Sequence, residues 1–262
     1  MSKVRYERVG AASVVTIDRP ERRNAVDPET ADELREAYGQ FESDDEARVM
    51  VLTGEGDAAF CAGADLKSIA EARTNEELAR AWLSPRPDGP LGFTRLTPSK
   101  PTIAAISGYA LAGGLELALW CDLRVATETA KLGFPERRWG VPLIDGGTQR
   151  LPRIVGMGRG LDLILSGRIV EADEALAMGL LTEVVAPGKH LERALEMAEG
   201  LASFPQETML ADRRSALEGF GLSLEEGIAR EAEIGSKVSG VGVEGAARFA
   251  EGEGRGGAGA GV

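Results

Sequence analysis

Residues 112–122 read AGGLELALWCD, a pair of glycines followed by an apolar run with a single carboxylate, Glu116, in its middle. The preceding residues, PTIAAISGYALAGG (101–114), have the pattern of a buried strand that leads through glycines into a helix, and LRVATETA (123–130) follows as another strand. A carboxylate in this setting is drawn towards a core, where it is costly unless its pKa rises or it gains partners. Glu116 therefore either has a chemical task at this junction or faces solvent.

The segments before this junction extend the alternation of strands and helices. ASVVTID (12–18) and RVMVLTG (48–54) are short β-branched runs, and PETADELREAYGQFESD (28–44) between them has helical spacing. This order of elements predicts an α/β core.

The C-terminal part of the chain has a different character. From about residue 146 onwards helical spacing dominates, and the chain ends on EGEGRGGAGAGV, which is Gly-rich and has no apolar anchors. We expect a core domain over residues 1–190, a helical region over residues 191–250 and a disordered tail over residues 251–262.

Composition and charge exclude several classes of function. The 262 residues include 30 basic and 42 acidic side chains, and the formal net charge of −12 argues against nucleic acid as a partner. No run approaches the roughly eighteen apolar residues of a membrane span, and no secretory signal is recognisable. Cys61 and Cys121 lie in apolar settings typical of free thiols in a reducing compartment. We expect a soluble, cytoplasmic protein with no membrane partner.

Metal and nucleotide sites find little support in the residue pattern. The single histidine, His190, begins a predicted helix that we expect at the surface, and one His with two distant Cys does not suit a zinc site. Residues 54–59 match G-x-G-x-x-A after a strand, but the residues that follow, FCAGADLKSIAEA (60–72), read as helix, and no acidic ribose contact follows at the end of a next strand. We therefore expect neither a metal nor a nicotinamide cofactor.

Three stretches remain that suit chemistry: FCAGADL (60–66), AGGLELAL (112–119) and FPERRWGVPLIDGGTQRLPR (134–153). In the second, two glycines stand where a helix begins with free N–H groups, which favour an anion. Glu116 lies in the first turn of that helix, and Glu136 follows in a loop after a Phe-Pro step. Two carboxylates beside backbone donors suit proton transfer on a carbonyl compound, although solvated or capping roles stay open.

Taken in this order, the three stretches resemble the enoyl-CoA hydratase/isomerase family, also called the crotonase family. The similarity extends from VVTIDRPERRNAV (14–26) to EGAARFAEG (244–252). It implies a spiral of ββα units with a helical C-terminal trimerisation region, assembled as a homotrimer or a hexamer. It also implies a lyase of fatty acid metabolism that acts on acyl-CoA thioesters and needs no other cofactor, since coenzyme A is part of the substrate.

The resemblance implies roles for four residues. The amides of Ala64 and Gly113 would form the oxyanion hole for the thioester oxygen. Glu116 would orient and deprotonate the water, and Glu136 would share that water and protonate C2. The implied reaction is hydration of the 2,3 double bond to 3-hydroxyacyl-CoA. An enoyl-CoA or dienoyl-CoA isomerase stays open as an alternative, and a non-catalytic homologue is disfavoured because both Glu residues are present.

The resemblance also implies where substrate binds. Arginines near residue 22 border the CoA pocket in relatives, although solvated roles stay open for them, and the backbone of residues 62–66 suits the adenine and pantetheine side. Phe249 is expected to close a neighbouring subunit's pocket. The candidate substrate-binding residues are Arg22, Arg23, Ala25, Ala62, Asp65, Leu66 and Asp145.

Two expectations concern the acyl end. Asp145, where hydratases commonly have a small residue, is interpreted either as the N-cap of the helix that follows or as a third carboxylate in the acyl pocket, as in the dienoyl-CoA isomerase branch. The segment 68–96, with Trp82, Pro85 and Phe93, is expected to line that pocket.

Overall fold

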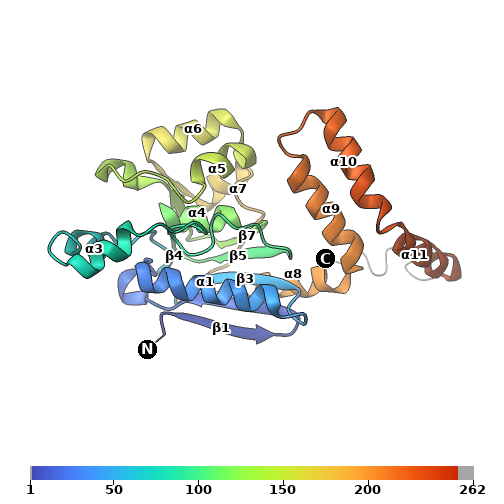
Figure 1. Cartoon of the computed structure of the whole chain (residues 1–262), viewed down its shortest axis with the longest axis horizontal. Coiled ribbons are helices and arrows are strands. Elements are labelled where there is room, and N and C mark those ends of the chain that lie inside the picture. Colours follow the sequence, from blue (N-terminus) through green and yellow to red (C-terminus); the bar gives the residue numbers. More distant parts are fainter. Residues whose placement is uncertain (1, 253–262) are drawn as a thin grey trace. The chain divides into compact units, whose positions relative to one another are not determined.

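A computed structural model describes residues 2–252, and the chain divides into two compact units, Met1–Ala198 and Glu199–Val262 (Figure 1). The strands of the first unit are β1 (Val4–Val9), β2 (Ala12–Ile17), β3 (Val49–Gly54), β4 (Ala59–Cys61), β5 (Thr102–Ile106), β6 (Tyr109–Leu111), β7 (Leu123–Thr127), β8 (Lys131–Gly133), β9 (Ile169–Glu171) and β10 (Glu183–Val185). Its helices and helical turns are η1 (Pro20–Arg22), α1 (Pro28–Ser43), α2 (Leu66–Glu71), α3 (Glu76–Leu83), α4 (Gly113–Trp120), η2 (Pro135–Trp139), α5 (Gly147–Val155), α6 (Met157–Ser166) and α7 (Ala172–Ala177). Helix α8 (His190–Ser203) begins in the first unit and ends in the second.

Two sheets form the centre of the first unit. The larger has the strand order β1-β2-β3-β5-β7-β10, and the smaller has the order β4-β6-β8-β9. All strand pairs are parallel except β1 with β2 and β8 with β9. After each of β3, β5 and β7 the chain adds a strand to the smaller sheet and then enters a helix or helical turn. The chain therefore winds as successive ββα turns, which confirms the predicted α/β spiral.

The strands of the larger sheet explain the continuous apolar runs in the sequence. Every residue of β2, β3 and β5 is buried, as in parallel sheets that are covered on both faces. Helix α1 lies against β1 and β2, and its start is fixed by Asp27, whose carboxylate accepts a hydrogen bond from the Thr30 amide at 2.9 Å. The burial of these strands holds their ends in place, so the loops that follow them have fixed starting positions.

The first turn of α4 lies directly against the end of β4. A Cβ atom on Gly114 would lie 1.9 Å from the backbone oxygen of Cys61, so only glycine permits this approach. Ala112, just before the helix, has φ +53° and ψ −127°, a conformation that costs a non-glycine residue about 1–3 kcal/mol. The close approach places the start of α4 beside residues 62–64.

The second unit consists of helices within the described residues. Helices α9 (Gln206–Gly219) and α10 (Leu224–Ser236) pack against each other, and α11 (Ser239–Glu251) contacts α9. Ser223 and Glu226 form a capping box at the start of α10. The large apolar side chains that this unit exposes are Leu217, Phe220, Leu222, Leu224, Ile228, Val243 and Phe249.

Several expectations need correction or stay open. Residues 60–72 do not read as helix throughout, because β4 covers Ala59–Cys61 and α2 begins only at Leu66. His190 begins a helix, but it is buried rather than exposed, and burial lowers its pKa. The predicted tail from residue 253 onwards lies outside the described residues. Across residues 2–252, no helix combines the length and apolarity of a bilayer span.

Candidate functional site

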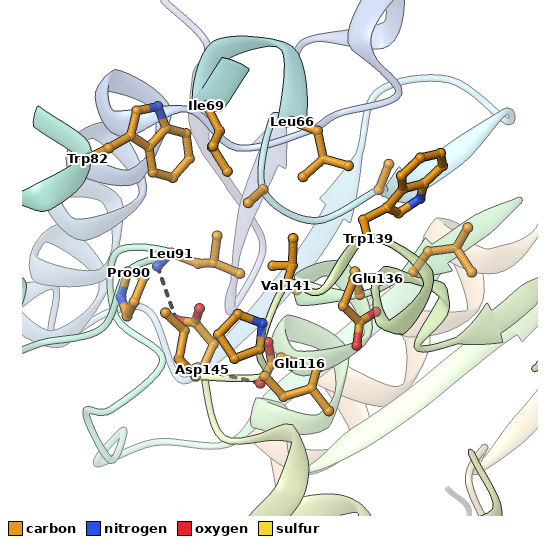
Figure 2. Close-up of a pocket in the computed structure, with 18 of the residues that line it drawn as sticks. Leu66, Ile69, Trp82, Pro90, Leu91, Glu116, Glu136, Trp139, Val141 and Asp145 are labelled. Carbon is orange, nitrogen blue, oxygen red and sulfur yellow. Dashed lines mark hydrogen bonds between the residues drawn. The ribbon is translucent and has the colours of Figure 1, made fainter. Parts of the chain in front are cut away.

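A cavity of about 410 Å³ lies in the first unit, between the residues after β4, the start of α4 and the loop from η2 to α5. Most of its lining side chains are apolar. Three carboxylates from three separate segments, those of Glu116, Glu136 and Asp145, lie on one side of the cavity, and Leu66, Ile69 and Trp82 lie on the other (Figure 2). Three acids around one apolar cavity are an arrangement that calls for a chemical explanation.

Glu116 is buried and held by two main-chain amides. Its Oε1 atom accepts hydrogen bonds from the amides of Asp145 at 3.0 Å and of Gly147 at 2.7 Å. Burial raises the pKa of Glu116 to about 7; the charges of Asp145 and Glu136 also raise it, and the two amide bonds oppose the rise. A carboxylate of this pKa is divided between its two protonation states near neutral pH, which suits proton transfer.

Glu136, in η2, has the opposite surroundings. Both of its carboxylate oxygens are buried, and neither accepts a hydrogen bond from any residue between 2 and 252. Burial raises the pKa of this carboxyl as well. The main-chain amide of Glu136 and the charge of Arg137 only partly oppose this rise, so protonation of Glu136 is easier than that of a solvated carboxyl, and the protonated form is the one that donates a proton.

Two backbone amides line the cavity next to Glu116. A Cβ atom on Gly63 would lie 2.8 Å from the Gly113 nitrogen, and one on Gly113 would lie 3.6 Å from the Ala64 nitrogen, so the two amides are neighbours. Neither amide donates a hydrogen bond to a described residue. Two neighbouring free donors at a cavity wall, one of them at a helix start, suit an oxygen that becomes negatively charged.

Asp145 belongs to the cavity and is not a helix cap. Helix α5 begins at Gly147 with Gly146 at its N-cap position and no side-chain cap, so the N-cap interpretation is wrong. The Oδ1 atom of Asp145 instead accepts hydrogen bonds from the amide of Leu91 at 3.1 Å and from the hydroxyl of Thr94. Burial raises the pKa of this carboxyl too.

The structure brings only some of the predicted substrate-binding residues to the cavity. Ala62 and Leu66 line it, but Arg22, Arg23, Ala25 and Asp65 do not. The carboxylate of Asp65 caps α2 and forms an ion pair with Arg19 at 3.1 Å, and Arg23 is exposed with its guanidinium 5.2 Å from the centre of the Tyr109 ring. The predicted roles of these residues in CoA binding stay predictions.

The acyl side of the cavity differs from the expectation in part. Trp82 lines the cavity as expected, but Pro85 faces a neighbouring hollow, and Phe93 is fully buried in the core, with its ring centre 4.4 Å from that of Trp120. The sequence reasoning missed the loop 139–144, which contributes Trp139, Val141, Pro142, Leu143 and Ile144. The sequence signal for this loop is its apolar run WGVPLI. In the structure these side chains are not all core residues, since Trp139 is 74% exposed and Ile144 50% exposed.

Comparisons with known proteins agree with this geometry. Residues 7–253 match the family model described as enoyl-CoA hydratase/isomerase. The short-chain-enoyl-CoA hydratase of Clostridium acetobutylicum is 37% identical over 237 residues, which cover 89% of this chain and 88% of that protein. The (E)-benzylidenesuccinyl-CoA hydratase of Thauera aromatica is 38% identical over 82% of each chain. A crystal structure of an enoyl-CoA hydratase from Mycobacterium tuberculosis superposes with a TM-score of 0.85 at 36% identity, covering 95% of this chain and 96% of the other.

Proposed function

Because this chain belongs to the enoyl-CoA hydratase/isomerase family, we propose that it is an enoyl-CoA hydratase, which adds water across the 2,3 double bond of an enoyl-CoA to give 3-hydroxyacyl-CoA. The observation that carries the proposal is the pair of buried carboxylates, Glu116 and Glu136, at one apolar cavity beside two free amides. Hydration needs a base for the water, an acid for C2 and donors for the thioester oxygen. This cavity offers all three.

Each step of the reaction has a group that suits it. The amides of Ala64 and Gly113 hold the thioester oxygen and stabilise the enolate that forms when water attacks C3; removal of one such donor typically costs about a hundredfold to a thousandfold in rate. Glu116 takes the proton of the attacking water through Oε2, which accepts no hydrogen bond from the described residues, while Oε1 stays fixed by the amides. Glu136 gives its proton to C2. Both new bonds form on the same face, and no electrons are exchanged with a cofactor, so we propose none beyond the CoA of the substrate.

The test is turnover of crotonyl-CoA and of longer and branched enoyl-CoAs, followed by mass spectrometry, in the wild type, Glu116→Gln and Glu136→Gln. We expect a gain of one water by the wild type and a loss of about 10²- to 10⁴-fold in kcat for each variant. Glu36→Gln, an exposed position on α1, is the matched control and should retain full activity.

Two outcomes would overturn the proposal. Products of unchanged mass with a shifted double bond would identify an isomerase, for which one carboxylate is enough as a proton shuttle. Full activity of both variants would exclude the carboxylate pair as the source of catalysis.

We also propose a homotrimer or hexamer in the cytoplasm. The exposed apolar side chains of the second unit support burial against other subunits, and Cys61 and Cys121, both free and buried, suit a reducing compartment. Analytical ultracentrifugation of the full chain tests the assembly, and a monomer at micromolar concentration would contradict it.

A further inference from the structure

Only one oxygen of the Asp145 carboxylate is satisfied by the protein. Oδ1 accepts hydrogen bonds from the Leu91 amide and the Thr94 hydroxyl, whereas Oδ2 accepts none from the residues that the structure describes. The residue is only 3% exposed and lines the cavity, so a ligand in the cavity can reach Oδ2 (Figure 2). A ligand that shields a carboxylate oxygen from water without donating to it is penalised, and Oδ2 therefore favours a ligand that supplies a donor.

The direction of this carboxylate is fixed by its surroundings. The main-chain amide of Asp145 donates a hydrogen bond to Oε1 of Glu116, and the main-chain carbonyl of Asp145 accepts one from Arg150 at 2.8 Å. The same guanidinium donates to the carbonyl of Thr94 at 2.6 Å, so the residue and its side-chain partner are clamped together. Oδ2 is therefore preorganised relative to the catalytic Glu116, as recognition of a particular substrate atom requires.

No described residue donates a hydrogen bond to Oδ2, although the charge of Arg95, which lines the same cavity, acts on this carboxylate. Pro90, Leu91, Leu143 and Ile144 line this part of the cavity. A purely aliphatic acyl chain would cover Oδ2 with apolar atoms and leave it without water or a donor. An acyl chain with its own donor would satisfy it.

The charges around the cavity decide which donor fits. A carboxylate on the acyl chain would face three acids, Glu116, Glu136 and Asp145. An ammonium group would be attracted by these acids, but it would give up its water in a largely apolar cavity and lie beside Arg95, which lines the same cavity and donates to the carbonyls of Arg86 and Ile144. A neutral hydroxyl group avoids both the repulsion of a carboxylate and the desolvation cost of a cation.

We propose that Asp145 is a specificity-determining residue that selects enoyl-CoA substrates whose acyl chain carries a hydroxyl group, an inference that rests on the proposed hydratase function. The hydroxyl donates to Oδ2 while Glu116 and Glu136 act on the double bond. Asp145 thus takes part in recognition and transfers no proton.

The experiment compares hex-2-enoyl-CoA with its analogues that carry a hydroxyl at C4, C5 or C6, and with the analogue that carries a ketone at C5. We expect the wild type to favour the best hydroxyl substrate about tenfold to a hundredfold in kcat/KM over the unsubstituted chain. The ketone, which only accepts hydrogen bonds, should gain nothing.

Asp145→Asn gives the sharpest variant, because its amide oxygen can replace Oδ1 towards Leu91 and Thr94 while its NH₂ group replaces Oδ2. The variant should turn over the ketone about as well as the hydroxyl, because its NH₂ group donates to either oxygen. Leu143→Met is the matched control, since it changes the same wall without changing a polar group, and it should keep the preference for hydroxyl.

Two results would overturn the inference: equal kcat/KM for the hydroxylated and unsubstituted chains in the wild type, or no gain for the ketone in Asp145→Asn. If no chain is hydrated, the proposed function fails but the recognition is still measured. Calorimetric binding of saturated 4-, 5- and 6-hydroxyhexanoyl-CoA against hexanoyl-CoA then gives the preference directly, and equal Kd values in the wild type would exclude it.

Discussion

Glu116 and Glu136 are two buried carboxylates at one cavity, yet the protein treats them differently. Glu116 is carried by a helix whose start is locked against β4, and one of its oxygens is held by two amides. Glu136 lies on the short turn η2, and both of its oxygens are buried without a hydrogen bond from any described residue. Burial raises the pKa of both carboxyls, but only Glu116 has an oxygen that amides of another segment hold in place.

This difference separates the chemical roles of two residues of the same type. Hydrogen bonds to one oxygen of Glu116 fix its direction and leave the other oxygen for water. Burial raises the pKa of Glu136, which eases the protonation that an acid for C2 needs in the proposed reaction. The pKa of Glu116 is raised as well, so the two residues differ in how their oxygens are held: two amides fix one oxygen of Glu116, and no other described residue donates a hydrogen bond to Glu136. The following changes test each half of that comparison.

The largest effect is expected from breaking the support of Glu116. In Gly114→Ala the added Cβ would meet the backbone oxygen of Cys61 at 1.9 Å, and the clash is relieved only by displacing α4 or the end of β4. We expect a loss of about 3 kcal/mol or more in the free energy of unfolding, measured by urea titration, with activity lost as well.

Gly39→Ala is the matched control for this change. It lies inside α1 with no heavy atom within 4 Å of the new Cβ, so alanine should stabilise the protein by about 0.5–1 kcal/mol. Equal stabilities of the two variants would mean that α4 is not locked against β4.

Neutralising Glu116 should give an effect of nearly the same size, and one that depends on pH. The folded-state pKa of about 7 lies above the ordinary value of 4.5, so the wild type loses stability as pH rises from about 4.5 to about 7. Glu116→Gln keeps an oxygen for the two amides and removes this loss. We expect the variant to gain up to ~3 kcal/mol relative to the wild type by pH 8, and nothing at pH 4.

Chemical denaturation at both pH values measures this gain. The stability of Glu136→Gln relative to the wild type should also increase as pH rises, because burial raises the pKa of Glu136 as well. A variant Glu116→Gln that is less stable than the wild type at pH 8 would show that the two amides more than offset the cost of burial.

Shortening each side chain by one methylene separates the two residues most directly. Glu116→Asp withdraws the carboxylate from the amides of Asp145 and Gly147 and leaves buried donors unpaired, which costs about 1–3 kcal/mol of stability. Glu136→Asp breaks no hydrogen bond and should cost about 1 kcal/mol or less.

Activity should fall about a hundredfold in both shortened variants, since either acid is displaced from the reacting atoms. Thermal unfolding together with initial rates of hydration reads out both quantities. Equal losses of stability would contradict the contrast between a held and an unheld carboxylate.

The sequence could predict that Glu116 and Glu136 lie at one site because this side of the cavity is built from local signals. Apolar runs marked the strands, the glycine pair marked a close approach before a helix, and Glu116 stood out as a charge inside an apolar run. The family resemblance then assigned Glu136, whose loop carries no comparable signal of its own. Each of these features lies within a short stretch of sequence.

The acyl side depends on contacts between distant segments, which no local pattern reports. Asp145 stands two residues before a helix and suggested a cap, but the chain turns at Gly146 with φ +103° and the carboxylate reaches the Leu91 amide, 54 residues away. Phe93 suggested a pocket aromatic, but its ring packs on Trp120 in the core. The long segment 68–96 has no periodicity that distinguishes its core side from its cavity side.

The smallest expected effect concerns the influence of Asp145 on Glu116. The charged groups that face Glu116 are Asp145, Glu136 and Arg150, and the charge of Asp145 raises the pKa of Glu116. Glu116 must be ionised to accept the proton of water, so kcat/KM of the wild type should fall below an apparent pKa near 7. Asp145→Asn keeps the hydrogen bonds that hold the loop but removes the charge. Its acidic limb should therefore move to lower pH, the direction expected when a neighbouring like charge is removed.

Leu143→Met, which leaves all charges in place, is the control for this shift, and both profiles are recorded on an unsubstituted enoyl-CoA so that recognition of a hydroxyl group does not contribute. A limb that moves to higher pH in Asp145→Asn would mean that the substitution disturbs the two amides and that their hydrogen bonds outweigh the charge of Asp145 in setting the pKa of Glu116. Glu116 would then depend on its amides more than on the neighbouring charge, which would sharpen its contrast with Glu136.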